Sequence, residues 1–163
     1  MRTRNDIKVV PMRPSSAKLT SKLIRKVISG LEIYNVRARR VEMSKYTPVG
    51  LTQMQAEDES SVMIAILEKR PVGFCLSRYD DGVIWLAWFG VLGDCRRMGV
   101  GAALLEALER TVPRRKCHKI WCDTRASNLP SQRLLKKVGF RRLCKLAEHW
   151  YGQDFYLWEK FVR

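Results

Sequence analysis

Residues 83–91 read VIWLAWFGV, and residues 92–111 continue as LGDCRRMGVGAALLEALERT. The first segment is apolar on both faces, as is typical of a central strand that is covered on each side. The second segment starts with a loop rich in glycine and arginine and ends in a helical pattern, with Leu104, Leu105 and Leu108 facing inward. The stretch therefore predicts a buried strand, a glycine loop and a helix in immediate succession.

The loop at 96–101, RRMGVG, has the chemistry of a pyrophosphate-binding site. The first N–H groups of a helix lack an intrahelical partner, and the helix dipole makes that end positive. Glycine lets a ligand approach the backbone closely, and Arg96 and Arg97 can add charge-assisted hydrogen bonds to phosphate. Neither the ending of a P-loop nor a GxGxxG dinucleotide pattern is present. The alternative interpretation is that Gly99 and Gly101 only allow the helix to pack tightly against the sheet.

Strand and helix patterns surround this stretch. Strands are predicted at Ile7–Met12, Val62–Leu67, Val72–Tyr79, Val83–Val91, Lys119–Thr124, Arg141–Leu146 and Phe155–Lys160. Helices are predicted from Ser15 or Ser16 to Gly30, at Val36–Lys45, at Gly99–Thr111, and from Ser127 or Asn128 to Gly139. A loop is predicted at Pro48–Gly50, and turns at Lys69–Gly73 and Asp80–Gly82. Hairpins come first and helix–strand alternation later, so the fold class is α+β, or mixed α/β.

The chain carries a large positive charge. Lys and Arg number 31 against 16 for Asp and Glu, which gives a net charge of +15. Residues 1–45 and 91–163 each contribute +9, and residues 46–90 contribute −3. Such a field attracts cofactor phosphates, nucleic acid, ribosomes and acidic peptides, and it disfavours polycations such as polyamines and aminoglycosides. The alternative is a solvated basic surface that serves solubility only.

Length and composition favour one packed domain, because 163 residues are 46% hydrophobic and 29% charged. No apolar run approaches the roughly 20 residues of a membrane helix, and residues 1–13 lack the apolar core of a signal peptide. We therefore expect a cytoplasmic protein without a membrane partner. The five cysteines form no CxxC pair, and Cys117, His118 and Cys122 do not match a metal-site spacing, so we expect reduced thiols and no metal.

Residues 91–105 resemble motif A of the GNAT N-acetyltransferases. That motif is (Gln/Arg)-x-x-Gly-x-(Gly/Ala) after a strand end, and Gly93 stands where proline is usual. The sequences NLPS at 128–131 and VGF at 138–140 resemble the family's N-x-x-A…GF helix, and HWYGQDFYL at 149–157 is similar to its aromatic loop and closing strand. The three motifs are collinear. The chain is identified as a member of this family, nearest in motifs to the ribosomal-protein alanine and protein N-terminal acetyltransferases.

The resemblance implies a fold and an organisation. One acetyltransferase domain would span residues 1–163, with a CoA-binding core at about 62–160. The GNAT fold has a mostly antiparallel, twisted sheet, here of six to seven strands with about four helices, splayed at the central strand to admit acetyl-CoA. Family members often dimerise, so a homodimer is compatible with the resemblance.

In the family, the strand before the glycine loop binds the pantetheine arm of the cofactor. Carried over, Phe89, Gly90 and Val91 would do so through their backbone, with the Val91 N–H as the oxyanion donor. The pyrophosphate would lie on Arg96, Arg97, Met98, Gly99, Val100, Gly101 and Ala102. Asn128 would contact the CoA arm or an ordered water, and Ser131 belongs to the same cofactor site.

Direct transfer needs an uncharged amine, and amine pKa values of about 8 to 10.4 make a base useful. Asp123 lies five residues before Asn128, where the resemblance places a glutamate base in ribosomal-protein alanine acetyltransferases. Aspartate is shorter, so a relaying water would be required; the alternative is a turn or capping carboxylate. His149 is a second candidate base because its reference pKa lies near working pH, although packing or substrate contact would also explain it.

Leu135 departs from the family, in which a tyrosine often protonates the departing thiolate. Tyr151, Tyr156 or a water would replace it, or the thiolate would leave unaided, since a thiol pKa is about 8.5. Trp150 and Tyr151 are expected to line the acceptor side, because N-terminal acetyltransferases use tyrosines of this loop to hold the first residues. The core is predicted to hold Trp85, Trp88 and Trp121.

Three functions are compatible with these features. The first is an acetyl-CoA-dependent N-acetyltransferase that acts by direct transfer on a primary amine, of a peptide or protein. The second is a small-molecule acetyltransferase for an amino acid, amino sugar or antibiotic. The third is a weakly or non-catalytic module that binds acyl-CoA or nucleic acid, which Leu135 and the net charge suggest.

Overall fold

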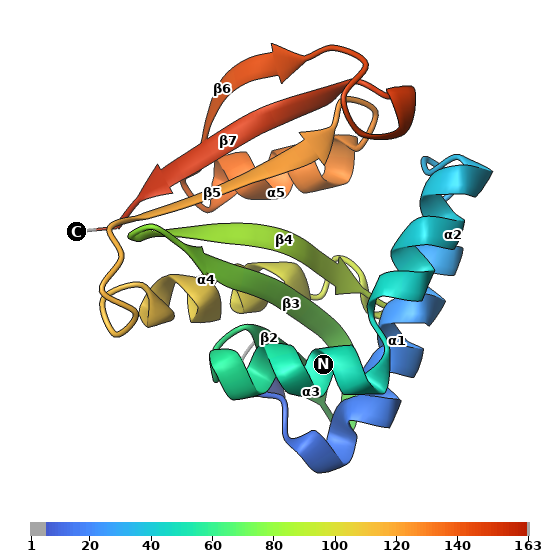
Figure 1. Ribbon diagram of the computed structural model, residues 1–163, viewed down its shortest axis with the longest axis vertical. Helices are drawn as coiled ribbons and strands as arrows, with labels where there is room; N and C mark the ends of the chain where they lie inside the picture. Colours follow the sequence, from blue (N-terminus) through green and yellow to red (C-terminus); the bar gives the residue numbers. More distant parts are fainter. Residues whose placement is uncertain (1–5, 163) are drawn as a thin grey trace.

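The computed structural model describes residues 6–162 and shows a seven-stranded sheet with helices on both faces (Figure 1). The strands are β1 (Lys8–Pro11), β2 (Val62–Leu67), β3 (Arg70–Asp80), β4 (Val83–Val91), β5 (Lys119–Arg125), β6 (Arg141–Leu146) and β7 (Phe155–Phe161). The helices are α1 (Ala17–Ser29), α2 (Val36–Lys45), α3 (Pro48–Glu57), α4 (Val100–Thr111) and α5 (Leu129–Lys137). Short 3₁₀ turns are η2 (Pro14–Ser16), η3 (Gly93–Cys95) and η4 (Trp150–Gly152). Within residues 6–162 no helix is long and apolar enough to cross a bilayer.

The strand order is β1-β2-β3-β4-β5-β7-β6, and β4 and β5 form its parallel pair. The other neighbours pair antiparallel. This arrangement confirms the α+β class, the mostly antiparallel sheet and each predicted strand. It also confirms the four predicted helices and adds a fifth, α3.

The extra helix corrects the prediction for residues 48–50, which were expected to form a loop. The Thr47 side-chain oxygen accepts a hydrogen bond from the Gly50 N–H at 3.1 Å. Pro48 occupies the first turn, where its missing N–H would have had no partner. Leu51 is buried among side chains of α1 and the sheet. The proline and glycine therefore mark a helix start, not a break.

Two tight turns join the first hairpins. Asp81 and Gly82 have φ values of 47° and 84°, and two successive positive values are the signature of the type I′ turn that favours Asp-Gly. Glu68 and Lys69 have φ values of 50° and 62°. The turn between β2 and β3 therefore lies earlier than the predicted Lys69–Gly73, and β3 starts sooner.

A β-bulge in β4 decides which side chains face which side of the sheet. Leu76 pairs with Trp88, but its neighbour Ser77 pairs with Leu86, so Ala87 is an extra residue in β4. Without the bulge, residues of equal parity would share one face along the whole strand. With it, the parity of the inward-facing residues switches at position 87.

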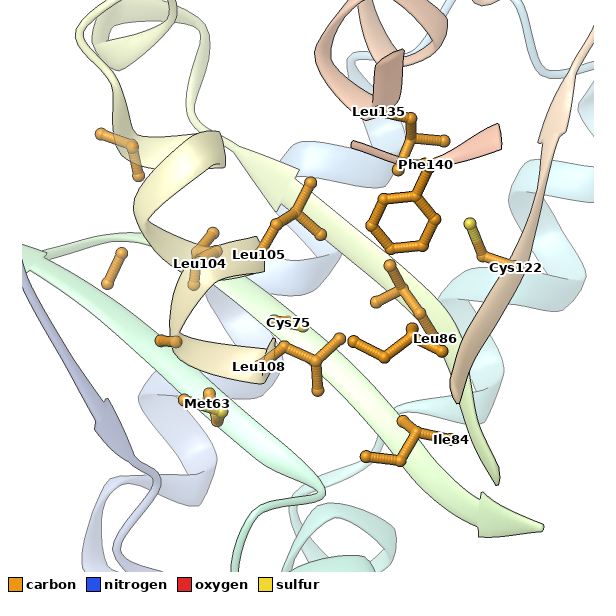
Figure 2. Close-up of a cluster of buried hydrophobic side chains, with 14 of the residues drawn as sticks. Met63, Cys75, Ile84, Leu86, Leu104, Leu105, Leu108, Cys122, Leu135 and Phe140 are labelled. Carbon is orange, nitrogen blue, oxygen red and sulfur yellow. The ribbon is translucent and has the colours of Figure 1, made fainter. Parts of the chain in front are cut away.

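Two hydrophobic cores lie on opposite faces of the sheet. Ile84 and Leu86 before the bulge, and Phe89 after it, contact the core beneath α4, which Figure 2 shows. Trp88 packs instead against the core that α1 and α3 form on the other face. The bulge therefore turns Trp88 away from the α4 side.

The strands β4 and β5 are joined only at their beginnings. The first three residues of β4 pair with the first three of β5, after which the two strands diverge (Figure 1). The Leu92 N–H donates to the Val72 carbonyl at 2.9 Å. Because paired and unpaired positions alternate along an antiparallel ladder, Phe89 and Val91 direct their backbone N–H and C=O groups away from β3. These groups face the gap between β4 and β5.

Candidate active site

The divergence of β4 and β5 opens a cleft of about 530 Å³. Its walls come from the sheet, from the start of α5, from α2 and the loop before it, and from the loop before β7. The lining residues are Tyr34, Glu42, Lys45, Tyr46, Arg78, Trp85, Leu86, Ala87, Trp88, Phe89, Cys122, Asp123, Thr124, Arg125, Asn128, Ser131, Trp150, Tyr151 and Phe155.

The cleft reaches the face of the sheet that α1 and α2 cover. Ile120 and Cys122 of β5 belong to the core beneath α4 (Figure 2). Successive side chains of a strand point to opposite faces, so Asp123 and Arg125 point toward the α1–α2 side. The glycine loop at 96–101 contributes no lining residue. The predicted phosphate site and the cleft are therefore separate regions that meet near β4.

Asp123 presents a partly buried carboxylate to the cleft. Its side chain is 13% exposed, and Oδ2 accepts a hydrogen bond from Trp150 Nε1 at 2.7 Å. His149 Nε2 lies 4.0 Å from the same oxygen. Burial raises the pKa of Asp123, while the Trp150 hydrogen bond and His149 act in the opposite direction. Oδ1 accepts no hydrogen bond from the described residues, so it is available to a substrate or a water.

Sequence patterns did not identify a second buried carboxylate, Glu42 of α2. Oε1 accepts hydrogen bonds from the Tyr151 hydroxyl and from Lys45 Nζ, both at 2.7 Å. Oε2 accepts one from Trp88 Nε1 at 3.0 Å. The one signal in the sequence is that Glu42 is the sole acidic residue in the stretch 33–56. Its three donors hold this carboxylate in a fixed position.

The loop before β7 bridges the cleft to the segment around α2. Asn35 Nδ2 donates to the Tyr151 carbonyl, and Gln153 Nε2 donates to the Ile33 carbonyl, both at 3.3 Å. Burial and the hydrogen bond to Glu42 raise the pKa of Tyr151. Its hydroxyl is therefore a weaker acid than that of a free tyrosine, and it ties the two sides of the cleft together.

The other candidates for proton transfer lie farther from the cleft. Leu135 is fully buried in the core beneath α4 (Figure 2). Tyr156 lies under the guanidinium of Arg142, 4.5 Å from ring centroid to Cζ, and does not line the cleft. His149 packs edge-on against Trp150 with ring centroids 4.5 Å apart. His149 therefore contacts Trp150 and does not itself line the cleft.

Two of the tryptophans predicted as core line the cleft: Trp88 does so in addition to its contact with the core beneath α1 and α3, and Trp85 does so in place of a core position. Trp88 stacks at 5.3 Å on Tyr34 and bonds Glu42 through its indole N–H. Trp85 meets the half-buried Trp121 edge-on, with centroids 4.8 Å apart. The bulge explains the error, because it places positions 85 and 88 on one face, and the departure of β5 leaves that face open.

The glycine loop has features that suit an anion. Gly99 caps α4 with a φ of 87°, and no side chain caps the helix, so the first N–H groups of α4 are available to a ligand. Arg96 and Arg97 are exposed beside it. A Cβ on Gly101 would lie 2.7 Å from Leu134 Cδ2 of α5. This second glycine therefore also supports the packing interpretation.

The remaining residues assigned to the cofactor differ in what they expose. Phe89 lines the cleft, whereas the Val91 side chain packs against the core beneath α4. Gly90 uses its N–H and C=O to pair with Phe74 of β3. A Cβ there would lie 2.8 Å from Val27 Cγ1. Gly90 thus serves the packing of α1 on the sheet.

Asn128 and Ser131 lie together in the cleft wall. Asn128 Oδ1 accepts a hydrogen bond from the Ser131 N–H at 3.2 Å and so caps α5, as predicted. Val100 is buried and Met98 packs against the same core, so only the backbone of these two residues faces outward. Ala102 is half-buried in the first turn of α4.

Sequence reasoning also missed Arg125, which is 2% exposed and yet lines the cleft. Its Cζ lies 3.5 Å from the ring centroid of Tyr34. The signal that could have found it is its position two residues after Asp123, on the same side of β5. Across residues 6–162, no three His, Cys, Asp or Glu side chains gather as a metal ion would require.

Comparison with known proteins identifies relatives of this chain. Residues 30–140 match the model of the acetyltransferase (GNAT) family. A protein named N-alpha-acetyltransferase from Sulfurisphaera tokodaii is 29% identical over 116 residues, which cover 62% of this chain and 69% of the relative. Another of that name, from Sulfolobus acidocaldarius, is 30% identical over 109 residues, which cover 58% of this chain and 64% of the relative.

Solved structures share the fold over nearly the whole chain. Ard1 from Thermoplasma volcanium has a TM-score of 0.77 at 19% identity, covering 97% of this chain and 99% of that one. The ribosomal-protein alanine N-acetyltransferase from Escherichia coli has a TM-score of 0.74 at 15% identity, covering 96% of this chain and 94% of that one. At these identities the similarity concerns the fold alone.

Proposed function

The chain belongs to the GNAT family of acetyl-CoA-dependent N-acetyltransferases, and on this basis we propose that it acetylates the N-terminal amine of a peptide or protein by direct transfer. The observation that carries the proposal is the partly buried carboxylate of Asp123, which faces the cleft with one free oxygen. The names of the two archaeal relatives support an N-terminal amine as the acceptor.

The residues of the glycine loop fit the phosphates of the cofactor. The uncapped N-terminus of α4, the positive φ of Gly99 and the exposed Arg96 and Arg97 would hold the diphosphate. The backbone groups of Phe89 and Val91 that face the gap would hold the pantetheine arm. Acetyl-CoA supplies the activated acetyl group.

Asp123 would take the proton that the acceptor amine loses. As the amine nitrogen bonds to the acetyl carbon, the carbon–sulfur bond breaks and the proton passes to Oδ1, directly or through one water. A carboxyl pKa raised toward neutrality suits a base that must also release its proton. Glu42 is less suited, because three donors already occupy it. The Val91 N–H would stabilise the negative charge on the acetyl oxygen.

The departing thiolate would leave without a side-chain acid. The Leu135 side chain has no proton to donate. The raised pKa of Tyr151 makes its hydroxyl too weak an acid to protonate the thiolate readily. A thiol pKa of about 8.5 makes the thiolate a tolerable leaving group, which water can protonate.

The walls of the cleft favour a peptide over a cationic small molecule. Lys45, Arg78 and Arg125 line it together with the carboxylates of Glu42 and Asp123, and the excess of cationic side chains would disfavour an aminoglycoside or a polyamine. Trp150 and Tyr151 would contact the first residues of the acceptor from the loop before β7.

Labelled acetyl-CoA and two peptide sets would test this function. One set has a free N-terminus and no lysine, and the other has a blocked N-terminus and one lysine. We expect label only on the first set. The Asp123→Asn variant should lower kcat/KM by about 10² to 10⁴, the usual contribution of a general base, with acetyl-CoA affinity unchanged.

The matched control is Asp81→Asn, the same exchange in the turn between β3 and β4, where asparagine is a favoured residue. It should keep the wild-type rate. Label on lysine alone would refute the N-terminal acceptor, and label on no peptide would refute the peptide acceptor altogether. Equal rate losses in the two variants would remove Asp123 from the role of base.

A further inference from the structure

Arg125 carries a buried positive charge that the described residues leave unpaired. The residue is 2% exposed, and its Nε, Nη1 and Nη2 donate no hydrogen bond to any atom of residues 6–162. A guanidinium stays ionised at physiological pH. A buried charge without a partner strongly disfavours a fold, so the site calls for an anion or for acceptor atoms from a ligand.

Aromatic rings hold the guanidinium but do not neutralise it. Its Cζ lies 3.5 Å from the ring centroid of Tyr34 and 5.2 Å from that of Phe155. Such cation–π contacts fix the plane of the group and leave the N–H groups at its rim without acceptors. Burial raises the pKa of Tyr34 to about 12, while its interaction with Arg125 acts in the opposite direction. Tyr34 is therefore uncharged at neutral pH and does not neutralise the guanidinium.

The acidic groups of the cleft do not pair with Arg125 either. Glu42 is bonded to three other donors. Asp123 accepts its hydrogen bond from Trp150, and the charge of Arg125 acts to lower the pKa of Asp123 without a hydrogen bond between the two side chains. The cofactor phosphates are assigned to the loop at 96–101, which contributes no residue to this cleft. With the acidic side chains and the cofactor phosphates excluded, the acceptor is the ligand that can supply the anion to Arg125.

We infer that Arg125 binds a carboxylate of the acceptor within the first two residues of the acetylated peptide. The inference rests on the proposed function, which places the acceptor amine at Asp123. The two residues share one side of β5, about 6.6 Å apart along the strand. An extended peptide advances about 3.3–3.6 Å per residue, so an acidic side chain at its first or second position spans that distance.

The chemistry of Arg125 suits this ligand. A guanidinium binds a carboxylate through two parallel hydrogen bonds, and the +15 charge of the chain draws acidic segments toward it. A free amino acid would offer the same group as its α-carboxylate, so the experiment includes it as a separate arm.

Matched peptides test the inference. Pairs that differ only as Asp or Asn, at position one or position two, are compared by kcat/KM, together with free aspartate. We expect the wild-type protein to prefer the Asp peptide of one pair by about tenfold to a hundredfold, the range of hydrogen bonds to charged groups. We expect it to acetylate free aspartate more slowly than that peptide.

The Arg125→Met variant keeps an unbranched side chain between the rings and removes the charge. It should bring the Asp/Asn ratio close to one, and this ratio is the readout whatever the variant does to the absolute rates. Arg125→Lys keeps the charge but not the fork and should give an intermediate ratio. The control is Arg142→Met, because Arg142 also stacks on an aromatic ring but lies outside the cleft; its ratio should equal that of the wild type.

A structural role for Arg125 would lower the rates with Asp and Asn peptides equally, and that result would overturn the inference. So would an unchanged ratio in Arg125→Met, a wild-type preference for Asn, or a matching loss of CoA affinity. Faster acetylation of free aspartate would overturn the peptide source. If no peptide is acetylated, the proposed function fails, and equilibrium binding of the same peptides to the CoA complex decides this inference separately. Tighter binding of Asp peptides that Arg125→Met abolishes would support it, and equal binding would reject it.

Discussion

Asp123 is subject to two opposing influences. Burial disfavours its charge, whereas the Trp150 N–H and the nearby His149 favour it, and the raised pKa shows that burial prevails. A carboxylate in this position destabilises the folded state when it is ionised. The same property brings its proton affinity closer to what a base needs near neutral pH. We expect Asp123 to lower the stability of the folded protein and to raise its activity.

That balance predicts how the stability of Asp123→Asn depends on pH. A raised pKa means that the folded state binds the proton more tightly than the unfolded state does, so ionisation above that pKa weakens the fold. The variant should therefore be more stable than the wild type at neutral pH. The advantage should shrink as pH falls through the raised pKa and become constant below about 3.9, the pKa of an unperturbed Asp.

Denaturant unfolding of both proteins across this pH range measures the difference. The wild-type kcat/KM should fall over the same interval, as the base becomes protonated. Stability curves that stay parallel at every pH would show that Asp123 has no raised pKa in the folded protein.

At this scale the sequence predicts some site residues and misses others for a physical reason. Asp123, Trp150 and Tyr151 lie in motifs with fixed spacing, and all three line the cleft. Glu42 and Arg125 have no such motif. Their importance comes from burial among partners distant in the chain, which a one-dimensional pattern of charges does not record.

On our proposal, cofactor binding depends on the start of α4, and a pair of glycines tests this. Gly99 and Gly82 have nearly the same conformation, with φ values of 87° and 84°, and Gly82 has no atom within 4 Å of an added Cβ. Gly99→Glu and Gly82→Glu should therefore suffer similar backbone strain. Only Gly99→Glu should weaken CoA binding, by tenfold or more, because it places a carboxylate against the phosphates; tenfold corresponds to about 1.4 kcal/mol.

Calorimetric titration with CoA, next to thermal unfolding of both variants, separates strain from repulsion. Equal affinities in the two variants would move the phosphates away from the glycine loop.

Elements with strong local signals were predicted within two residues, and the exceptions have local causes. The segment at 48–57 combines Pro, Gly and polar residues, so its composition favours a loop, but Thr47 and Pro48 form a cap that starts a helix. The bulge at Ala87 leaves the apolar pattern of β4 intact. It changes only the face of the sheet to which the side chains of β4 point. Trp85 was therefore assigned to the correct strand and to the wrong environment, whereas Trp88 packs against a core and lines the cleft as well.

The molecule as a whole consists of two halves of one sheet that share three residue pairs, the core beneath α4 and a bridge across the cleft. The hydroxyl of Tyr151 makes the strongest contact of that bridge, to the buried Glu42. Tyr151→Phe should lower the free energy of unfolding by about 1–3 kcal/mol, the range for a hydrogen bond to a charged group. It should also speed hydrogen exchange in α2.

Tyr79→Phe is the matched control, because Tyr79 is 55% exposed and its hydroxyl makes no hydrogen bond to the described residues. It should leave stability and exchange unchanged. If both variants behave alike, the bridge does not hold the two halves together.

Most of this architecture could be predicted from sequence because each motif lies within one half. The strand–loop–helix unit from Val83 to Thr111 and the helix–strand unit after Asn128 each carry their own signals. The parallel contact between β4 and β5 is short and leaves no pattern of its own. The cleft arises from that shortness, so its shape and its two missed charged residues required the structure.

The separation of the cleft from the glycine loop has a practical consequence for turnover. On our assignment, acetyl-CoA enters from the side of the glycine loop and the peptide enters through the cleft, and the two meet near β4. Neither ligand would block the release of the other. CoA would therefore exchange for acetyl-CoA while a protein acceptor stays bound. On this arrangement the enzyme need not release a large protein substrate before it binds the next acetyl-CoA.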